Sequence, residues 1–209
     1  MSTQTTDLTS VPDDSHILLI PVKGFAQGKH RLKHLFTDGD RYDLTKTLLK
    51  NTVLSIQPHQ LKIITEDKAV MVWAENEGID FISVNCTDLN SSITVASNKL
   101  LDIGLKRATV VHGDLALPLS NYTFPIIESS KFFKDEIFVV PDRYKDGTNV
   151  LSFPLNLNFK FQYGVHSFKK HVKTALDLGA NITIIENSPV SFDVDTEADL
   201  KYLKDTTYE

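Results

Sequence analysis

The feature that most constrains the fold is an alternation of short apolar runs with amphipathic segments in the first half of the chain. The run at residues 16–22, HILLIPV, is followed by a segment that contains glycine, as expected of a strand buried on both faces. From Asp40, apolar residues recur at helical spacing as far as Ile56, shortly before Pro58. The chain is therefore predicted to begin with a strand, a loop and a helix.

The same alternation continues with further predicted strands at residues 61–65, 79–84 and 108–112. Predicted helices separate them at residues 67–77 and 90–103, and a glycine follows the end of each helix. Four alternating units of this kind predict an α/β fold, with a mostly parallel sheet covered by helices.

The second half is less regular. Strands are predicted at residues 136–140 and 150–153, on either side of the turn-rich segment 141–147. A helix at residues 166–178 and a strand at 181–186 follow, with the apolar side of the helix formed by Phe168, Val172, Ala175 and Leu176. His171, in the same helix, is expected at the surface.

The length of 209 residues favours one domain, predicted at residues 16–209. Residues 1–15 are polar and acidic, so they are expected to form a disordered lead. This lead lacks the features of a signal peptide, and no apolar run approaches the roughly 18 residues of a membrane span, which together predict a cytoplasmic protein without membrane contact. Cys86 is the only cysteine, which excludes an intramolecular disulfide.

The formal net charge is −5, which argues against a general nucleic-acid binder. Positive charge is nevertheless concentrated after the first strand, where Lys23, Lys29 and Arg31 lie close to Gly24 and Gly28. A glycine-containing loop with cations can approach a polyphosphate closely. The loop is not a Walker A motif, because only three residues separate the two glycines. The alternative is a solvated basic loop.

Three carboxylates are expected beside this loop, at the carboxyl ends of the strands, where α/β sheets bind ligands. Asp193 and Asp195 are two residues apart, so in an extended segment they face the same side. Like charges repel, which suggests a divalent cation between them, and Asp114 completes a set that could hold one or two ions. The alternatives are solvated carboxylates, a turn or cap role for Asp114, and capping of the following helix by Asp195.

Two further segments combine glycine with a hydroxyl group. They are Gly147-Thr148-Asn149 and residues 163–168, and the second leads directly into a helix, whose free N–H groups favour an anion. A second phosphate could bind there, although an ordinary turn and an ordinary cap are alternatives. His112 lies near Asp114 and is expected to pack against its neighbours at the strand end.

Taken in order, these segments resemble the 2-phospho-L-lactate guanylyltransferases of deazaflavin coenzyme biosynthesis, over about residues 17–204. The resemblance is carried by IPVKGFAQGKHRL, the helix start at Asp88, VVHGDLALPL, PDRYKDGTNVL, FQYGVHSFKKHVKTALDLG and DVDTEADL. It implies a Rossmann-like nucleotidyltransferase fold, a mostly parallel mixed sheet flanked by helices. The implied reaction joins GMP from GTP to the phosphate of 2-phospholactate, phosphoenolpyruvate or 3-phosphoglycerate and releases pyrophosphate.

The resemblance also implies roles for individual residues and a homodimer. Lys23, Lys29 and Arg31 would engage phosphates. Mg²⁺, as two ions, would be held by Asp114, Asp193 and Asp195, with Asp114 also counted among the catalytic residues. The substrate-binding residues would be Asn90, Thr148, Gly164 and Ser167.

The chain departs from the pattern of this family at His30, Asp88, Ala116 and Glu197. None of these departures removes a proposed ligand. They leave open a related nucleotidyltransferase with another acceptor or base, and a catalytically inactive relative that senses a nucleotide or metabolite. An interaction module is disfavoured, because it gives no reason for three carboxylates opposite a basic loop.

Overall fold

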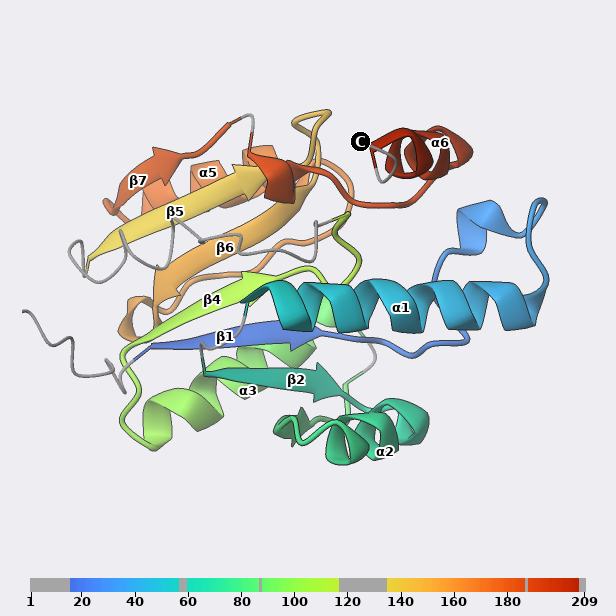
Figure 1. Ribbon diagram of the computed structural model, residues 1–209. Helices are drawn as coiled ribbons and strands as arrows, with labels where there is room; N and C mark the ends of the chain where they lie inside the picture. Colours follow the sequence, from blue (N-terminus) through green and yellow to red (C-terminus); the bar gives the residue numbers. More distant parts are fainter. Residues whose placement is uncertain (1–15, 57–59, 87, 117–134, 187, 207–209) are drawn as a thin grey trace, which may run out of the picture.

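The computed structural model describes residues 16–56, 60–86, 88–116, 135–186 and 188–206. Its central feature is one sheet with the strand order β3-β2-β1-β4-β6-β5-β7 (Figure 1). The strands are β1 (His16–Pro21), β2 (Leu61–Thr65), β3 (Phe81–Ser83), β4 (Arg107–Val111), β5 (Glu136–Pro141), β6 (Thr148–Pro154) and β7 (Asn181–Ile184).

The sheet is mixed but mostly parallel, as predicted. β1 pairs in parallel with β2 and β4, while β2 pairs with β3 and β5 with β7 in the same sense. β6 alone of these strands runs antiparallel to its neighbours, β4 and β5. The carboxyl ends of the parallel strands therefore meet at one edge of the sheet, on the right in Figure 1.

Helices cover both faces of the sheet (Figure 1). α1 (Asp38–Ile56) and α2 (Lys68–Asn76) lie on one face, and α3 (Leu89–Asp102) and α5 (Ser167–Asp177) lie on the other. α6 (Glu197–Thr206) lies outside these layers, near the loop that follows β1. Short 3₁₀ segments occur at η1 (His30–Leu32), η2 (Leu155–Leu157) and η3 (Pro189–Ser191).

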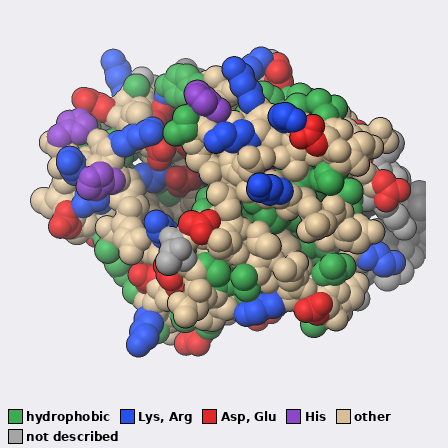
Figure 2. Space-filling view, turned by 180° about the vertical axis from the view of Figure 1, so that it is seen from behind, with side chains coloured by type: hydrophobic (Ala, Val, Ile, Leu, Met, Phe, Trp, Pro, Cys, Tyr) green, Lys and Arg blue, Asp and Glu red, His purple; other side chains and the backbone are tan. Residues whose placement is uncertain are grey.

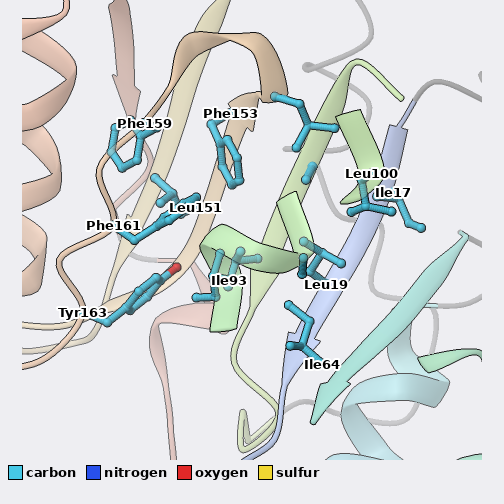
Figure 3. Packing of buried hydrophobic residues seen from close by; sticks show 14 of the residues in the cluster. Ile17, Leu19, Ile64, Ile93, Leu100, Leu151, Phe153, Phe159, Phe161 and Tyr163 are labelled. Carbon is cyan, nitrogen blue, oxygen red and sulfur yellow. The ribbon is translucent and has the colours of Figure 1, made fainter. Parts of the chain in front are cut away.

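The core is divided by the sheet into two clusters, which explains why the first strand is apolar throughout. Leu18 and Ile20 of β1 face α1 and α2, whereas Ile17 and Leu19 face the side of α3 and α5. Figure 3 shows the second cluster, in which Ile17, Leu19 and Ile64 lie near Ile93 and Leu100 of α3. Each such side chain contributes about 1.5–3 kcal/mol by its removal from water.

For the helix at residues 166–178, the predicted buried side is confirmed at Ala175 and wrong at Leu176 and His171. His171 is fully buried rather than exposed, and Leu176 is 61% exposed. The buried positions are Ser167, His171 and Ala175, four residues apart. His171 can be buried because both ring nitrogens find partners, the Thr148 hydroxyl at 3.0 Å and the Gln162 N–H at 3.0 Å.

The predicted N-terminal lead, residues 1–15, lies outside the described residues. The other predicted elements are present, with ends that differ by at most two residues. No helix in the described part of the chain combines the length and the apolar character needed to cross a membrane.

Candidate active site

The loop after β1 is packed tightly between two helices. A Cβ atom at Gly24 would lie 2.7 Å from Oδ2 of Asp67, the residue that caps α2. A Cβ atom at Gly28 would lie 2.3 Å from the Thr45 hydroxyl of α1. Only glycine therefore lets the backbone approach both helices, and this approach places the predicted cationic loop at the carboxyl edge of the sheet.

A pocket of about 280 Å³ lies beside this loop. Figure 2 shows acidic and basic side chains around a hollow on this side of the molecule. Charged and polar groups come from the loop, from the ends of β2 and β4 and from the segment before α6, while α3 adds mixed polar and apolar side chains. The residues that matter here are Lys23, Lys29, Glu66, Leu89, Ser92, His112, Asp114 and Asp195.

Lys29 is buried, and its ammonium group lies between two of the predicted carboxylates. Its Nζ is 2.5 Å from Asp114 Oδ2 and 3.0 Å from Asp195 Oδ1. Burial opposes the charge of Lys29, but the two carboxylates outweigh it and raise its pKa. Burial likewise opposes the charge of Asp114, but Lys29 and His112 together with a backbone hydrogen bond outweigh it and lower the pKa of that carboxyl. The cluster is thus held in its ionised form.

A short backbone ladder brings the carboxylates together. Leu115 forms an antiparallel bridge with Asp193, and the Val194 N–H donates to the Asp114 carbonyl at 3.1 Å. Val194 is fully buried between its two acidic neighbours. The predicted convergence of Asp114, Asp193 and Asp195 therefore follows from this pairing of distant segments.

Asp193 differs from the other two carboxylates because no cation among the described residues contacts it. Its Oδ1 accepts a long contact of 3.4 Å from the Asn149 amide. Burial, together with the charges of Asp114 and Asp195, raises the pKa of Asp193 to about 6. Of the three carboxylates, Asp193 would therefore be stabilised most by a bound cation.

Asp195 does not cap the following helix, which was the alternative explanation for its position. The start of α6 is capped reciprocally by Thr196 and Asp199: Asp199 Oδ2 accepts from the Thr196 N–H at 2.5 Å, and the Asp199 N–H donates to the Thr196 hydroxyl at 3.4 Å. The Asp195 carboxylate is left to contact Lys29, at the pocket.

The residues fit a divalent cation in chemistry, since three oxygen-donor side chains of like charge lie together. Within the described residues, however, no three side chains of the His, Cys, Asp and Glu types are arranged to coordinate one ion. Lys29 instead supplies the positive charge between Asp114 and Asp195.

The other predicted cations are placed differently from Lys29. Lys23 is exposed at the pocket. The Arg31 side chain is 75% exposed, and its Nη1 lies 3.9 Å from Asp195 Oδ2. Both side chains are therefore exposed enough to contact a charged ligand. Lys29, in contrast, is buried between Asp114 and Asp195.

The segments predicted to bind a second phosphate come together around α5. The Thr148 and Ser167 hydroxyl oxygens lie 3.4 Å apart, and both residues are buried. Gly164 has a φ of 114°, a conformation that favours glycine, and its carbonyl accepts the Ser167 N–H at 3.0 Å. The two motifs thus form one small polar cradle.

Asn90, predicted to bind substrate, has its side-chain amide engaged by the backbone of Tyr163. Its Oδ1 accepts the Tyr163 N–H at 2.7 Å, and its Nδ2 donates to the Tyr163 carbonyl at 3.3 Å. Asn90 thereby ties the start of α3 to the residue before Gly164, so its contact with the cradle is indirect.

Comparison with known families gives a match over residues 16–204 to the model described as "Guanylyl transferase CofC like". The chain belongs to the CofC-like guanylyl transferase family. This membership confirms the resemblance found in the sequence, and with it the prediction of a nucleotidyltransferase.

Two curated relatives of the CofC-like family cover most of the chain. The phosphoenolpyruvate guanylyltransferase of Chloroflexus aurantiacus is 26% identical over 85% of this chain and 89% of its own length. The 2-phospho-L-lactate guanylyltransferase of Methanosphaera stadtmanae is 27% identical over 88% of this chain and 81% of its own length.

Among solved structures, a protein from Desulfovibrio desulfuricans described as a nucleotide-diphospho-sugar transferase superposes with a TM-score of 0.74. It covers 92% of this chain, which covers 87% of that protein in turn, at 15% identity. The likeness confirms the predicted nucleotidyltransferase fold for this CofC-like chain.

Asn149 was named from the sequence only as part of the Gly147-Thr148-Asn149 segment, without a role of its own. Its amide contacts Asp193, and its carbonyl accepts the His112 N–H at 3.0 Å. Its position next to Thr148 in the GTN motif was the available signal. In this CofC-like chain, Asn149 connects the polar cradle with the carboxylate cluster.

Proposed function

We propose that the protein transfers GMP from GTP to the phosphate of a small three-carbon phospho-acid and releases pyrophosphate, as a step of deazaflavin coenzyme biosynthesis. The acceptors considered are 2-phospholactate, phosphoenolpyruvate and 3-phosphoglycerate. The observation that carries the proposal is the cluster of Lys29, Asp114 and Asp195 beside the pocket, in a chain whose family is that of guanylyl transferases.

The pocket at the carboxyl edge is assigned to the nucleotide. Lys23 stands exposed at its wall and can meet the triphosphate, while Lys29 and Arg31 hold positive charge where the phosphates would reach the carboxylates. Apolar side chains such as Leu89 and Val84 provide surface for the nucleoside.

The polar cradle is assigned to the phosphate of the acceptor. Thr148 and Ser167 offer hydroxyl groups, and Gly164 leaves the backbone accessible. Asn149 spans the short path from this cradle to Asp193. A phosphate in the cradle would therefore approach the nucleotide from the side of the carboxylates.

In the proposed reaction, an oxygen of the acceptor phosphate forms a bond to the α-phosphorus of GTP, and the bond from that phosphorus to the bridging oxygen of pyrophosphate breaks. A phosphate with a second pKa near 6 is largely dianionic at neutral pH, so no general base is needed. Catalysis then rests on positioning and charge neutralisation, for which the site supplies cations and fixed hydroxyl groups.

Magnesium would be held by Asp114, Asp193 and Asp195, and when bound it would neutralise charge on the phosphates. Asp193 is the natural first ligand, because of the three it alone has no cation in contact within the part of the chain that the structure describes. Lys29 would then share Asp114 and Asp195 with the ion or turn towards a phosphate.

The test is pyrophosphate release with magnesium, in a matrix of four nucleotides (GTP, ATP, CTP and UTP) and the three acids. Release that requires GTP and one acid supports the proposal and names the acceptor. Release with another nucleotide, or only when a sugar phosphate is added in place of the acids, supports the related transferase instead. GTP binding without release from any pair supports the inactive sensor.

The proposal also includes a cytoplasmic homodimer without nucleic-acid partners. The net charge of −5 supports the last point, because counterion release on nucleic acid requires a basic surface. Light scattering after gel filtration measures the oligomeric state directly.

A further inference from the structure

Internal hydrogen bonds and close packing constrain the turn between β5 and β6, at residues 141–147. The Asp142 N–H donates to the Gly147 carbonyl at 3.1 Å, and the Asp142 side chain accepts the Asp146 N–H at 2.9 Å. A Cβ atom at Gly147 would lie 2.9 Å from Asp142 Oδ2, so glycine is needed to close the turn. Thr148 of the proposed acceptor cradle follows immediately.

One side of this turn holds the start of α5. The Asp146 carbonyl accepts the Phe168 N–H at 3.0 Å, and the Asp146 carboxylate accepts the His166 N–H at 3.3 Å and contacts the His166 ring. The turn therefore fixes the backbone on either side of Ser167, the second hydroxyl of the cradle.

On the other side of the turn, Arg143 contacts the segment that carries Asp193 and Asp195. Its guanidinium group lies 4.6 Å from the ring centre of Tyr144 and 4.5 Å from that of Phe192. It donates to Asp199 Oδ1, and the Asp199 side chain is only 3% exposed. A buried carboxylate is thus paired with an arginine that two aromatic rings hold in place.

The second oxygen of Asp199 fixes the main chain of the site. Asp199 Oδ2 accepts the N–H groups of Asp195 at 2.9 Å and Thr196 at 2.5 Å, together with the Thr196 hydroxyl at 2.8 Å. The backbone of Asp195, whose side chain contacts Lys29, is therefore held by a residue that Arg143 holds in turn.

We propose that Arg143 is a positioning residue, which sets the Asp193–Asp195 segment relative to the acceptor cradle by holding Asp199. This inference rests on the proposed function for its effect on turnover, but its structural part does not. Without Arg143, Asp199 loses its counterion, and the amide groups of Asp195 and Thr196 lose a fixed acceptor. The carboxylate segment then keeps its bridge to Leu115 but no longer its tie to the turn.

The structural part is tested by amide hydrogen exchange of the free protein, comparing wild type with Arg143→Gln. We expect the amides of Asp195 and Thr196 to exchange about tenfold faster, while the Val194 amide, which donates to the Asp114 carbonyl, and the amides of β1 change little. Equal acceleration at all amides would show general destabilisation and overturn the inference, as would no change at Asp195 and Thr196.

Lys145→Gln is the matched control, because it removes a cation from the same turn. Lys145 pairs with Glu186 on the surface, at 2.7 Å, and has no part in the proposed site. Its exchange rates and turnover are expected to equal those of wild type. Arg143→Lys keeps the charge but loses the planar guanidinium, so it should give intermediate exchange rates.

The functional part is tested by the kinetics of guanylyl transfer. Arg143→Gln should lower kcat about tenfold with the KM for GTP changed by less than about twofold, because the pocket itself is intact. Asp199→Asn should have a similar effect, and the double variant should be no worse than either single variant. Wild-type kcat in Arg143→Gln, or additive losses in the double variant, would overturn the inference.

The absence of turnover in the wild-type protein would count against the proposed function. The amide exchange rates would still test whether Arg143 positions the Asp193–Asp195 segment.

Discussion

Positive charge is unevenly shared among the three carboxylates of the site. Lys29 lies within 3.0 Å of Asp114 and Asp195, whereas Asp193 receives only the 3.4 Å contact from Asn149. Lys29 therefore stabilises the ionised forms of Asp114 and Asp195, whereas an ionised Asp193 lowers the free energy of unfolding. Such a residue is expected to be retained for binding rather than for folding.

Asp193→Asn should make the protein more stable and inactive. Removing a buried charge that Asp114 and Asp195 repel is expected to raise the free energy of unfolding by about 1–2 kcal/mol, while turnover falls by orders of magnitude. Urea unfolding at pH 8 in the presence of EDTA measures the first effect. Asp195→Asn serves as the contrast: it takes a partner from the buried Lys29 and should lower stability. A destabilised Asp193→Asn would contradict this account.

His171 should make the fold sensitive to acid. Burial lowers its pKa to about 4, from about 6.5 in an unfolded chain. Between these values the unfolded state binds the additional proton, so stability is full above about pH 6.5 and falls as the pH drops towards 4. The loss is at most about 3 kcal/mol. Urea unfolding at pH 7 and pH 4.5 should show a smaller difference for His171→Gln than for wild type. Equal differences would exclude His171 as the cause.

The residue types of the site could be predicted from the sequence, but their pairing could not. Asp114, Asp193 and Asp195 were expected together because strand ends meet at one edge. Lys29 was expected to meet only phosphates, since nothing local shows that its partners lie 85 and 166 residues away. The tie from Arg143 to Asp199 spans 56 residues and was likewise invisible to spacing.

At the scale of elements, the loop after β1 depends on its fit against α1. Gly28→Ala would place a methyl group within 2.3 Å of the Thr45 hydroxyl, so the loop must shift, at an expected cost of about 1–3 kcal/mol and with weakened GTP binding. Gly39→Ala, inside α1, is the control. The nearest atom to a Cβ there is 3.7 Å away, and alanine favours the helix by up to about 1 kcal/mol. Calorimetric titration with GTP and thermal unfolding measure both effects; equal behaviour of the two variants would contradict the packing argument.

The elements were predicted well from local patterns, and for α5 only the buried side was partly wrong. The strands of the first half are apolar throughout because helices cover both faces, and that pattern is local. α5 carries its apolar residues on one side, but the neighbouring side with Ser167 and His171 is buried because their partners come from β6 and from the segment before the helix. The spacing of apolar residues predicts which side of a helix is buried. It does not show whether a histidine has the hydrogen-bond partners that allow it to be buried.

At the scale of the whole molecule, one sheet separates and connects the two cores. Successive residues of β1 and β4 belong to opposite clusters, so neither cluster can lose its packing while the other keeps a complete sheet. The described part of the chain should therefore unfold as a single unit, as one domain at residues 16–209 would.

This cooperativity is measured by urea unfolding with two probes. Trp73, the only tryptophan, lies in the cluster of α1 and α2 and packs at 5.8 Å against Phe25. Its fluorescence reports one core, while far-ultraviolet circular dichroism reports the helices of both. Coincident midpoints and slopes are expected. Separated transitions would show that the two cores unfold independently.

The span of 166 residues between Lys29 and Asp195 has a consequence for synthesis on the ribosome. At about 5–20 residues per second, Lys29 is added to the growing chain roughly 8–33 s before Asp195. During that interval the basic loop has no acidic partner from the C-terminal segment, and its lysine stays hydrated. The cluster beside the pocket can form only when translation has passed Asp195, so its assembly is among the last steps of folding.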